Sequence, residues 1–383
     1  MKKQGLFLMS VASVMFFACS DNQDSVQNPN VTSEPTLLSI SLTGTDNMKG
    51  RATGTPTPAE ESTVNDGIIY VFDAGGIVLK KAYFKAGDIT NSTGSIQIAT
   101  TTAASSVSVL LNTGISDSAS MAGKPYDIPS KTQLEALTVN LALSNGTGAA
   151  TQIKNNLLMS GNSTGTITFT GNPKTANVPI TVSRIASKIA INWSFVPNSG
   201  FTNKIRLVGA VVLNVPSSSH LFGTSLTVPS ANYIEGLPAN VLNNFPAGGY
   251  KPASGNMISN VNLLSVSGFT VTPVPDNHFY VFENTNISPT IVALVADFNE
   301  NGLDVPNASA NLRKYYPVVI NKATTGGQDG TMTIKRNVAY NVMLTVKGAG
   351  VDNPFNPIDP ASLNVTVTVA NWALIVNVNQ TFE

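Results

Sequence analysis

The sequence is short of the residues on which many enzymes and metal sites depend. Among 383 residues there are one cysteine and two histidines. No intramolecular disulfide can form, and His220 and His278 lie far apart, without Cys/His metal-ligand spacing around them. H-E-x-x-H and Walker patterns are absent, and acidic residues are scattered along the chain. The sequence therefore predicts no enzyme activity, metal site or cofactor. A hydrolase would need two carboxylates or the histidines to converge in a cleft.

Charge is also scarce. Only 11% of the residues are charged, compared with about 25% in typical soluble domains. The 22 basic and 22 acidic residues balance, so the chain lacks the basic field needed for nucleic acid or anionic membranes. We expect neither partner. The hydrophobic content of 42% and the abundance of Thr, Ser, Asn, Val and Gly are typical of an extracellular β-protein long enough for two domains.

The N-terminus has the pattern of a signal peptide over residues 1–18. Lys2 and Lys3 precede the apolar stretch "GLFLMSVASVMFFA", which is too short for a membrane span of about 20 residues. Ala18 precedes Cys19, and this ending resembles a bacterial lipobox in which the cysteine becomes lipidated. The alternative is an ordinary signal peptide that happens to end near a cysteine.

Cys19 opens a segment, residues 19–51, that we interpret as a lipidated propeptide. Residues 20–36 are polar, with almost nothing to bury, and predict a flexible tether. The stretch "LLSISL" follows and places Leu38, Ile40 and Leu42 on one face of a strand.

Short alternating runs separated by turn residues dominate the remaining chain, which predicts an all-β fold. "DGIIYVFDAGGIVLKKAYF" predicts a hairpin, and "SVSVLLNT" and "TGTITFTG" predict further strands. Ser130 with Gln133 predicts the start of one minor helix. The later runs are "NVPITVSRIASKIAINWSF", "NKIRLVGAVVLNV", "NHFYVFEN", "PTIVALVADFN", "YYPVVINK", "MTIKRNVAYNVMLTVKG" and "LNVTVTVANWALIVNVNQTFE". They fit a β-sandwich, and we place a boundary near residue 180, giving domains 52–180 and 181–383.

The C-terminal stretch changes its alternation partway along. Apolar side chains are odd-numbered from Leu363 to Val369 and even-numbered afterwards, so a bulge or break near Ala370 divides the tail into two strands. The first can complete the second domain's sheet. The second, about 371–383, is an apolar strand at a chain end, where strand addition to another subunit is favoured. Its apolar residues are Trp372, Leu374, Val376, Val378 and Phe382.

Exposed aromatic rings would favour a different function, the binding of glycans by a monomeric surface lipoprotein. Trp193 and Trp372 fall on the apolar side of their strand patterns, which predicts core positions. The pairs Tyr315–Tyr316 and Phe279–Tyr280 must place one ring on each face of a strand. These patterns favour packing over a glycan platform.

Arg51 raises a question of its own, because Lys49 and Arg51 are the only basic residues between Lys3 and Lys80. They follow the predicted strand 37–42 in a loop-like run, where a trypsin-like or arginine-specific protease could cut. Cleavage between Arg51 and Ala52 would detach the lipid, the tether and that strand, leaving a groove for another subunit's tail. The alternative is a solvated loop charge.

Taken together, these stretches resemble the FimA-type major fimbrillins, the type V pilins of Bacteroidales, over nearly the whole chain. The residues that carry the resemblance are Cys19, "SISL" followed by Arg51–Ala52–Thr53–Gly54, "NLLMSG", "VSRIASKIAINW", "HLFGTSL", "YYPVVIN", "KRNVAYNVMLTVKGAG" and "VTVTVANWALIVNVNQ". The resemblance implies two tandem transthyretin-like Greek-key β-sandwich domains, lipid-anchored export to the outer membrane, and cleavage after Arg51. It also implies polymerisation by donor-strand exchange through the C-terminal strand, without a cofactor.

The resemblance further implies the partners. These are other copies of the chain, tip and anchor fimbrial subunits, the maturation protease, and host or bacterial surface receptors. Tip and accessory subunits of the family lack a usable donor tail, whereas this chain has one, which favours a stalk position in a cell-surface fimbrium.

Overall fold

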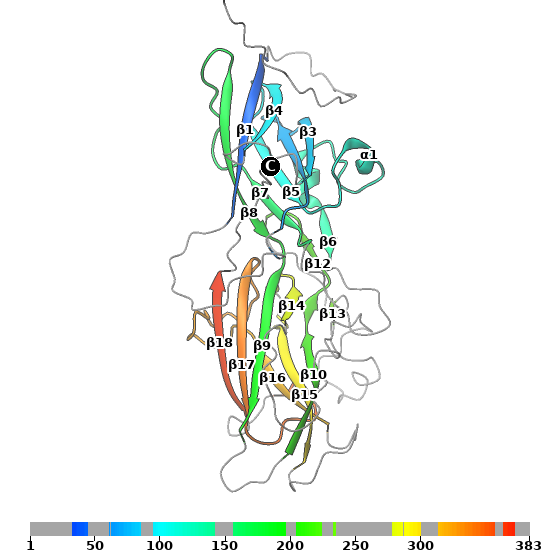
Figure 1. The fold of residues 1–383 in the computed structure, drawn as a ribbon, viewed down its shortest axis with the longest axis vertical. Helices are drawn as coiled ribbons and strands as arrows, with labels where there is room; N and C mark the ends of the chain where they lie inside the picture. The colour runs from blue at the N-terminus through cyan, green and yellow to red at the C-terminus, as the bar shows by residue number, and fades with distance from the viewer. Residues whose placement is uncertain are drawn as a thin grey trace, which may run out of the picture. The chain divides into compact units, whose positions relative to one another are not determined.

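The fold is described from a computed structural model. The described residues are 33–44, 61, 63–85, 95–141, 156–196, 204–223, 233–234, 278–285, 287–299, 313–356 and 363–371. They form β-strands and two short helices (Figure 1), which confirms the predicted all-β class with minor helix. Within these ranges neither helix is long or apolar enough to cross a membrane.

The elements fall into two groups along the chain. The first comprises β1 (Pro35–Gly44), β2 (Asp66–Phe72), β3 (Val78–Lys85), β4 (Ser95–Thr101), β5 (Ser106–Leu111), α1 (Ser118–Met121), α2 (Lys131–Ala136), β6 (Thr138–Asn140), β7 (Met159–Asn162) and β8 (Thr175–Arg184). The second comprises β9 (Ser187–Phe195), β10 (Lys204–Leu213), β11 (Val215–Pro216), β12 (Ser218–His220), β13 (Tyr233–Ile234), β14 (His278–Val281), β15 (Ile291–Asn299), β16 (Arg313–Val319), β17 (Val338–Val346) and β18 (Leu363–Asn371).

The first group forms a seven-stranded sheet in the order β3-β2-β5-β7-β8-β1-β4. Neighbouring strands are antiparallel except for β1 and β8, which are parallel. The strand β2 is buried along its whole length, and from Ile68 to Phe72 its side chains are apolar or aromatic on both faces. One face of the sheet packs into an apolar core that contains Leu38, Ile69, Val109 and Ile180.

Besides the two-stranded pair β11-β13, the second group forms two larger sheets, β14-β9-β17-β18 and β10-β15-β16. Their inward side chains share one core, in which Trp193 and Tyr340 of the first sheet cluster with Leu294 and Tyr316 of the second. Two sheets packed face to face over an apolar core make a β-sandwich. Trp193 is 1% exposed, as its alternation predicts.

The chain passes between the two groups through Ile185 and Ala186, which are both buried. The last strand of the first sheet ends at Arg184 and β9 begins at Ser187, whereas the sequence places the boundary near residue 180. A second link is the pairing of β6 with β12, which joins strands from before and after this passage.

The predicted hairpin and helix are confirmed. Strands β2 and β3 pair through a turn in which Gly76 has a φ of 78°, a conformation that favours glycine. The Asp73 carboxylate accepts a hydrogen bond from the Ile77 N–H at 2.8 Å. Helix α2 has Ser130 as its N-cap, but it ends at Ala136 because the following residues pair as β6.

The predicted strand over "TGTITFTG", residues 164–171, is wrong. This segment forms no regular strand and makes only a bridge at Thr170. Gly165 and Gly171 both have positive φ, which interrupts an extended ladder at each end. Ile167 and Phe169 still pack against the first core, so their alternation reflects partial burial and not strand pairing.

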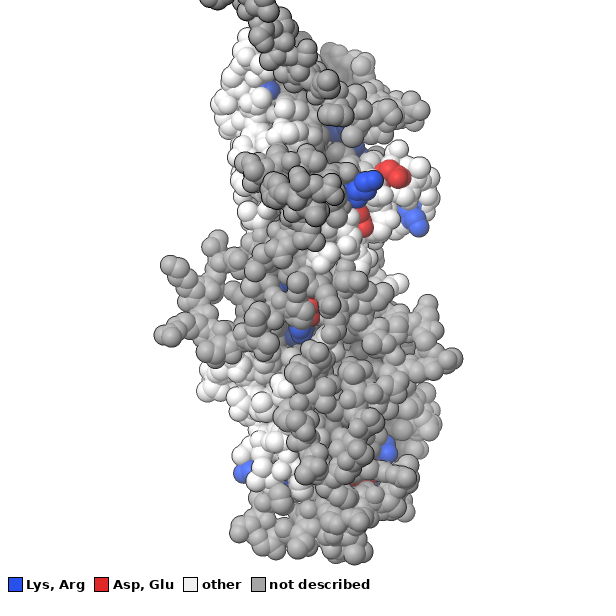
Figure 2. Space-filling view, in the orientation of Figure 1, with Lys and Arg blue, Asp and Glu red and all other residues white. Residues whose placement is uncertain are grey.

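Charged side chains are sparse on the described surface. On the face shown in Figure 2, most described residues are uncharged, and acidic and basic groups gather beside α1. Among the described residues, Lys81 forms an ion pair with Asp127.

Candidate functional site

Strand β1 is an interior strand of the first sheet, although it comes first in the described chain (Figure 1). One edge pairs in parallel with β8, from Leu37 opposite Thr175 to Gly44 opposite Val182. The other edge pairs antiparallel with β4. Removing β1 would therefore expose two unpaired strand edges and the groove between them. Unpaired edges of this kind bind another strand readily.

The inward face of β1 fills that groove with apolar side chains. Leu38 and Ile40 are 0% exposed, and Leu42 is partly buried against the same core. Full burial of one such side chain contributes about 1.5–3 kcal/mol, so Leu38 and Ile40 together contribute about 3–6 kcal/mol. Leu38, Ile40 and Leu42, the apolar residues of the strand predicted to be displaced, are therefore the side chains with which β1 covers the core.

Side-chain hydrogen bonds lie at the start of β1, at Ser39 and at Thr43. The Thr36 hydroxyl donates to the Lys174 carbonyl at 2.6 Å, and the Leu37 N–H donates to the same oxygen at 3.3 Å. The backbone of Glu34 bonds to the hydroxyl and the N–H of Thr102. The sequence of β1, "PTLLSISLTG", has no charged side chain. Backbone ladders and apolar burial hold the strand, and another apolar strand can supply both.

A separate anchor holds the chain between β1 and β2. The Glu61 side chain is 0% exposed. Its Oε1 lies 2.7 Å from Lys188 Nζ and accepts a hydrogen bond from the Tyr280 hydroxyl at 2.5 Å. The Glu61 carbonyl accepts from Arg184 Nε at 3.0 Å. This anchor joins the segment before β2 to strands β8, β9 and β14.

The electrostatics of the anchor explain why Glu61 is placed there. Arg184 is fully buried, and its burial lowers the pKa to about 10, while Glu61 and Tyr280 oppose the shift. A buried cation is costly without a nearby anion. The Glu61 carboxylate supplies negative charge close to both Arg184 and Lys188.

Arg51 lies between the end of β1 at Gly44 and this anchor in the sequence. Glu61 contacts β8, β9 and β14, so contacts outside β1 hold this part of the chain. The predicted lipidation site Cys19, the cleavage position Arg51–Ala52 and the whole donor segment from Trp372 to Phe382 lie outside the described residues. Strand β18 leads directly into that donor segment, and its pairing with β17 from Val338 opposite Asn371 confirms the first strand of the predicted tail.

Sequence reasoning missed the anchor, but one signal was present. Arg184 lies on the same parity as Val178, Ile180 and Val182, which are all buried. A charged residue on the apolar side of a strand pattern indicates a buried partner. The identity of that partner could not be deduced, since Glu61 and Tyr280 are distant in sequence.

The described residues form neither a metal site nor an exposed aromatic platform for glycans. No group of three or more His, Cys, Asp or Glu is placed to hold a metal there. The aromatic pairs are buried, with Tyr315 and Tyr316 at 6% and 0% exposure and Phe279 and Tyr280 at 2% each. Tyr315 and Tyr316 belong to different apolar clusters, as one ring on each face of the strand requires. Both faces of that strand are covered, so neither ring is available as a glycan platform.

Comparisons with known proteins agree with this architecture. Residues 36–213 match the family model "Major fimbrial subunit protein (FimA)". A major fimbrium subunit FimA type-2 from Porphyromonas gingivalis is 27% identical over 412 residues, covering 98% of each chain. A solved structure assigned to cell adhesion, from Bacteroides eggerthii, is 26% identical, with a TM-score of 0.64 over 90% of this chain and 98% of that one. A solved fimbrilin (FimA) from P. gingivalis, 20% identical, shares the fold with a TM-score of 0.62 over 90% and 99% of the two chains.

Proposed function

We propose that this chain, which is similar to the FimA-type major fimbrial subunits, is a stalk subunit of a cell-surface fimbrium that polymerises with other copies of itself. The observation that carries this proposal is the position of β1, an interior strand of the first sheet that has no charged side chain and comes first in the described chain. Such a strand can be exchanged for an equivalent one without breaking an ion pair of its own.

Maturation would begin with a lipoprotein precursor anchored to the outer membrane through Cys19. A protease cut after Arg51 would leave Ala52 as the new N-terminus and free β1 from the body. Support for this order comes from the anchor at Glu61, which is bound to Lys188 and Tyr280. The body can keep β2 in place while the groove between β8 and β4 opens.

The groove would then accept the tail of a second copy. Five apolar side chains, from Trp372 to Phe382, would replace the three of β1. At about 1.5–3 kcal/mol for each well-buried side chain, two additional side chains favour exchange by about 3–6 kcal/mol before the entropic cost of association. The free energy gained at each junction would drive polymerisation without a cofactor.

The same proposal assigns the fimbrium a role in adhesion, with tip and anchor subunits at its ends and receptors on host or bacterial surfaces as targets. The likeness to a solved protein assigned to cell adhesion supports this role. No described residue favours the alternative of a monomeric glycan-binding lipoprotein, since the paired aromatic rings are buried.

Three variants of the full precursor test the proposal. Arg51→Ala should remain uncut and monomeric after treatment with an arginine-specific protease, whereas Lys49→Ala, its matched control, should be cut and should polymerise. A chain that ends at Asn371 should be cut and stay monomeric, because it has a groove and no donor. Gel electrophoresis without heating, with N-terminal sequencing, distinguishes these outcomes. Polymers formed by the chain ending at Asn371 would contradict the assignment of the tail as donor.

A further inference from the structure

Strand β18 is the outermost strand of its sheet, and its outer edge is covered by a loop. The sheet order is β14-β9-β17-β18, so β18 pairs with β17 on one side only. On the other side the Val369 N–H donates to the Gly326 carbonyl at 2.8 Å. Gln328 Nε2 donates to the Val367 carbonyl at 3.2 Å. We call residues Lys322–Gly330 the edge cap.

Two glycines let the edge cap lie directly on the β18 backbone. Gly326 and Gly327 have φ angles of 65° and 82°, which residues with side chains rarely adopt. A Cβ atom at Gly326 would lie 2.4 Å from the Val367 carbonyl oxygen, and one at Gly327 would lie 2.7 Å from that of Val369. Any side chain at either position would push the cap away from the strand.

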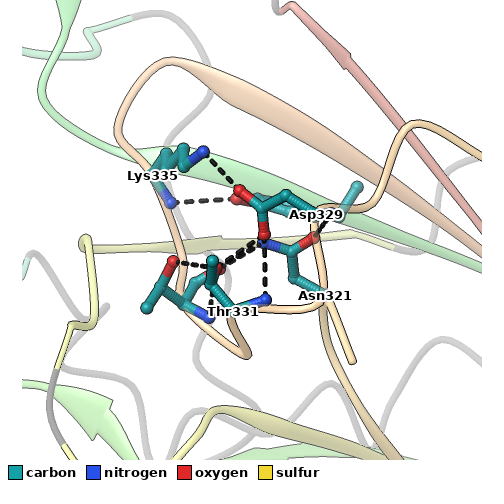
Figure 3. Close-up of polar contacts among 6 residues, drawn as sticks. Asn321, Asp329, Thr331 and Lys335 are labelled. Carbon is teal, nitrogen blue, oxygen red and sulfur yellow. Dashed lines mark hydrogen bonds and ion pairs between the residues drawn. The ribbon is translucent and has the colours of Figure 1, made fainter. Parts of the chain in front are cut away.

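A network of polar side chains holds the base of the edge cap closed (Figure 3). Asn321 is 2% exposed, and its Nδ2 donates to Asp329 Oδ1 at 2.5 Å. The Asp329 N–H donates back to Asn321 Oδ1 at 2.9 Å. The Thr331 hydroxyl donates to Asp329 Oδ1 at 2.6 Å, and Lys335 forms an ion pair with the same carboxylate. The two ends of the loop are thus joined independently of β18.

Hydrogen bonds from Lys335 and Thr331 hold the pKa of Asp329 below its usual range. The carboxylate therefore stays ionised, and the network stays intact, at any pH that the folded protein meets near neutrality. Permanent closure of this kind suits a structural cover and not a pH-dependent gate.

The composition of β18 explains why its edge needs a cover. Its sequence, "LNVTVTVAN", consists of Val, Thr and other uncharged residues, which favour strand pairing and offer no repulsion. Strand β3, an outermost strand of the first sheet, instead carries Lys80, Lys81 and Lys85. Lysines on an edge discourage other strands from adding. The chain thus protects one edge by charge and the other by a loop.

We propose that the edge cap closes β18 against strand addition by a second copy of this chain. Without it, the exposed Val/Thr edge would bind a strand from another copy and produce off-pathway aggregates. This inference goes beyond the proposed function, because it concerns an edge that the groove around β1 does not include. It also restricts where an incoming tail can add.

The test uses the full chain carrying Arg51→Ala, so that β1 keeps the groove closed and fimbrial polymerisation is blocked. Adding Gly326→Ala and Gly327→Ala should lift the edge cap from β18. Amide hydrogen exchange at Val369 should then accelerate about two- to tenfold, the effect of losing one hydrogen bond. Light scattering should detect concentration-dependent oligomers. Gly114→Ala with Gly123→Ala is the matched control, since both glycines have positive φ and a Cβ at either would meet no atom within 4 Å; it should stay monomeric.

A rescue variant separates edge pairing from general destabilisation. Thr368 is exposed on β18, so Thr368→Lys adds a charge to the opened strand and should restore the monomer. Two results would overturn the proposal: an opened Val369 amide in a chain that stays monomeric, or oligomers that persist with the lysine. If the glycine variant does not fold, Gln328→Ala removes the second bond to β18 and is judged by the same criteria. If the edge-cap variants fail these tests while the chain with Arg51 and both glycines intact forms normal filaments, the edge-cap proposal is wrong and the proposed function stands.

Discussion

The buried carboxylate of Glu61 lies 2.7 Å from the ammonium group of Lys188. Glu61 comes ten residues after Arg51 in the sequence. The proposed cut at Arg51 separates β1 from Glu61, and this ion pair holds the part of the chain that follows the cut. A subunit that sheds its first strand needs such a fixed point, because the new N-terminal segment would otherwise be free to pull on β2.

Glu61→Gln should lower the free energy of unfolding by about 3 kcal/mol. This is the low end of the range for removing one partner of a buried ion pair, because the Lys188 side chain keeps 15% exposure. Urea unfolding of the precursor measures this loss of unfolding free energy. Glu34→Gln is the control, since Glu34 is exposed and bonds to Thr102 through its backbone. Its effect should stay within about 0.5 kcal/mol. Equal losses for both variants would show that the anchor does not stabilise the fold.

Ile40→Ala should destabilise the precursor by about 2–5 kcal/mol, the usual cost of emptying a buried aliphatic position. The matched control is Leu37→Ala in the same strand, because Leu37 is 40% exposed and its loss should cost little. Denaturant titration of both variants measures the free energy of unfolding that each substitution removes. After cleavage at Arg51 and strand exchange, the difference between the two variants should vanish from the body, because β1 has left it.

Buried tyrosines should make the fold sensitive to alkali. Burial raises the pKa of Tyr340 to about 12, and burial also raises the pKa of Tyr70 and Tyr316. In the unfolded chain tyrosine ionises near pH 10, so the unfolded state loses protons first. The stability that the buried, neutral tyrosines contribute to the folded state is full below about pH 10 and is lost as the pH rises toward about 12.

Absorbance titration alongside circular dichroism tests the alkaline prediction. The buried tyrosines should ionise together with loss of structure, and Tyr340→Phe should reduce the dependence of stability on pH above about 10. Ionisation of all tyrosines at their ordinary pKa while the sheets persist would contradict it.

Local patterns in the sequence predict the strands well where alternation and burial coincide. Leu38, Ile40 and Trp193 occupy the buried positions that their parity indicates. Residues 164–171 show the limit of this reasoning, because Ile167 and Phe169 alternate without pairing. Alternation reports burial, and only neighbouring strands decide whether a buried segment joins a sheet.

Relationships across the chain could not be predicted from the sequence. That β1 lies between β8 and β4 depends on sheet order, which alternation does not encode. The partners of Arg184 come from Glu61 and Asn337, far apart in sequence. Residues 325–330, which are rich in glycine, form a loop, but its contact with Val369 depends on β18 being outermost.

The most direct measurement locks β1 in place and asks whether cleaved subunits still polymerise. Ser39 of β1 lies opposite Gln97 of β4, and their side chains are 2.9 Å apart, so Ser39→Cys with Gln97→Cys can form a disulfide across the two strands. After cutting at Arg51, the oxidised chain should stay monomeric and should polymerise once a reductant is added, whereas each single-cysteine chain should polymerise in both conditions. Polymers formed by the cleaved chain with the disulfide intact would contradict the release of β1.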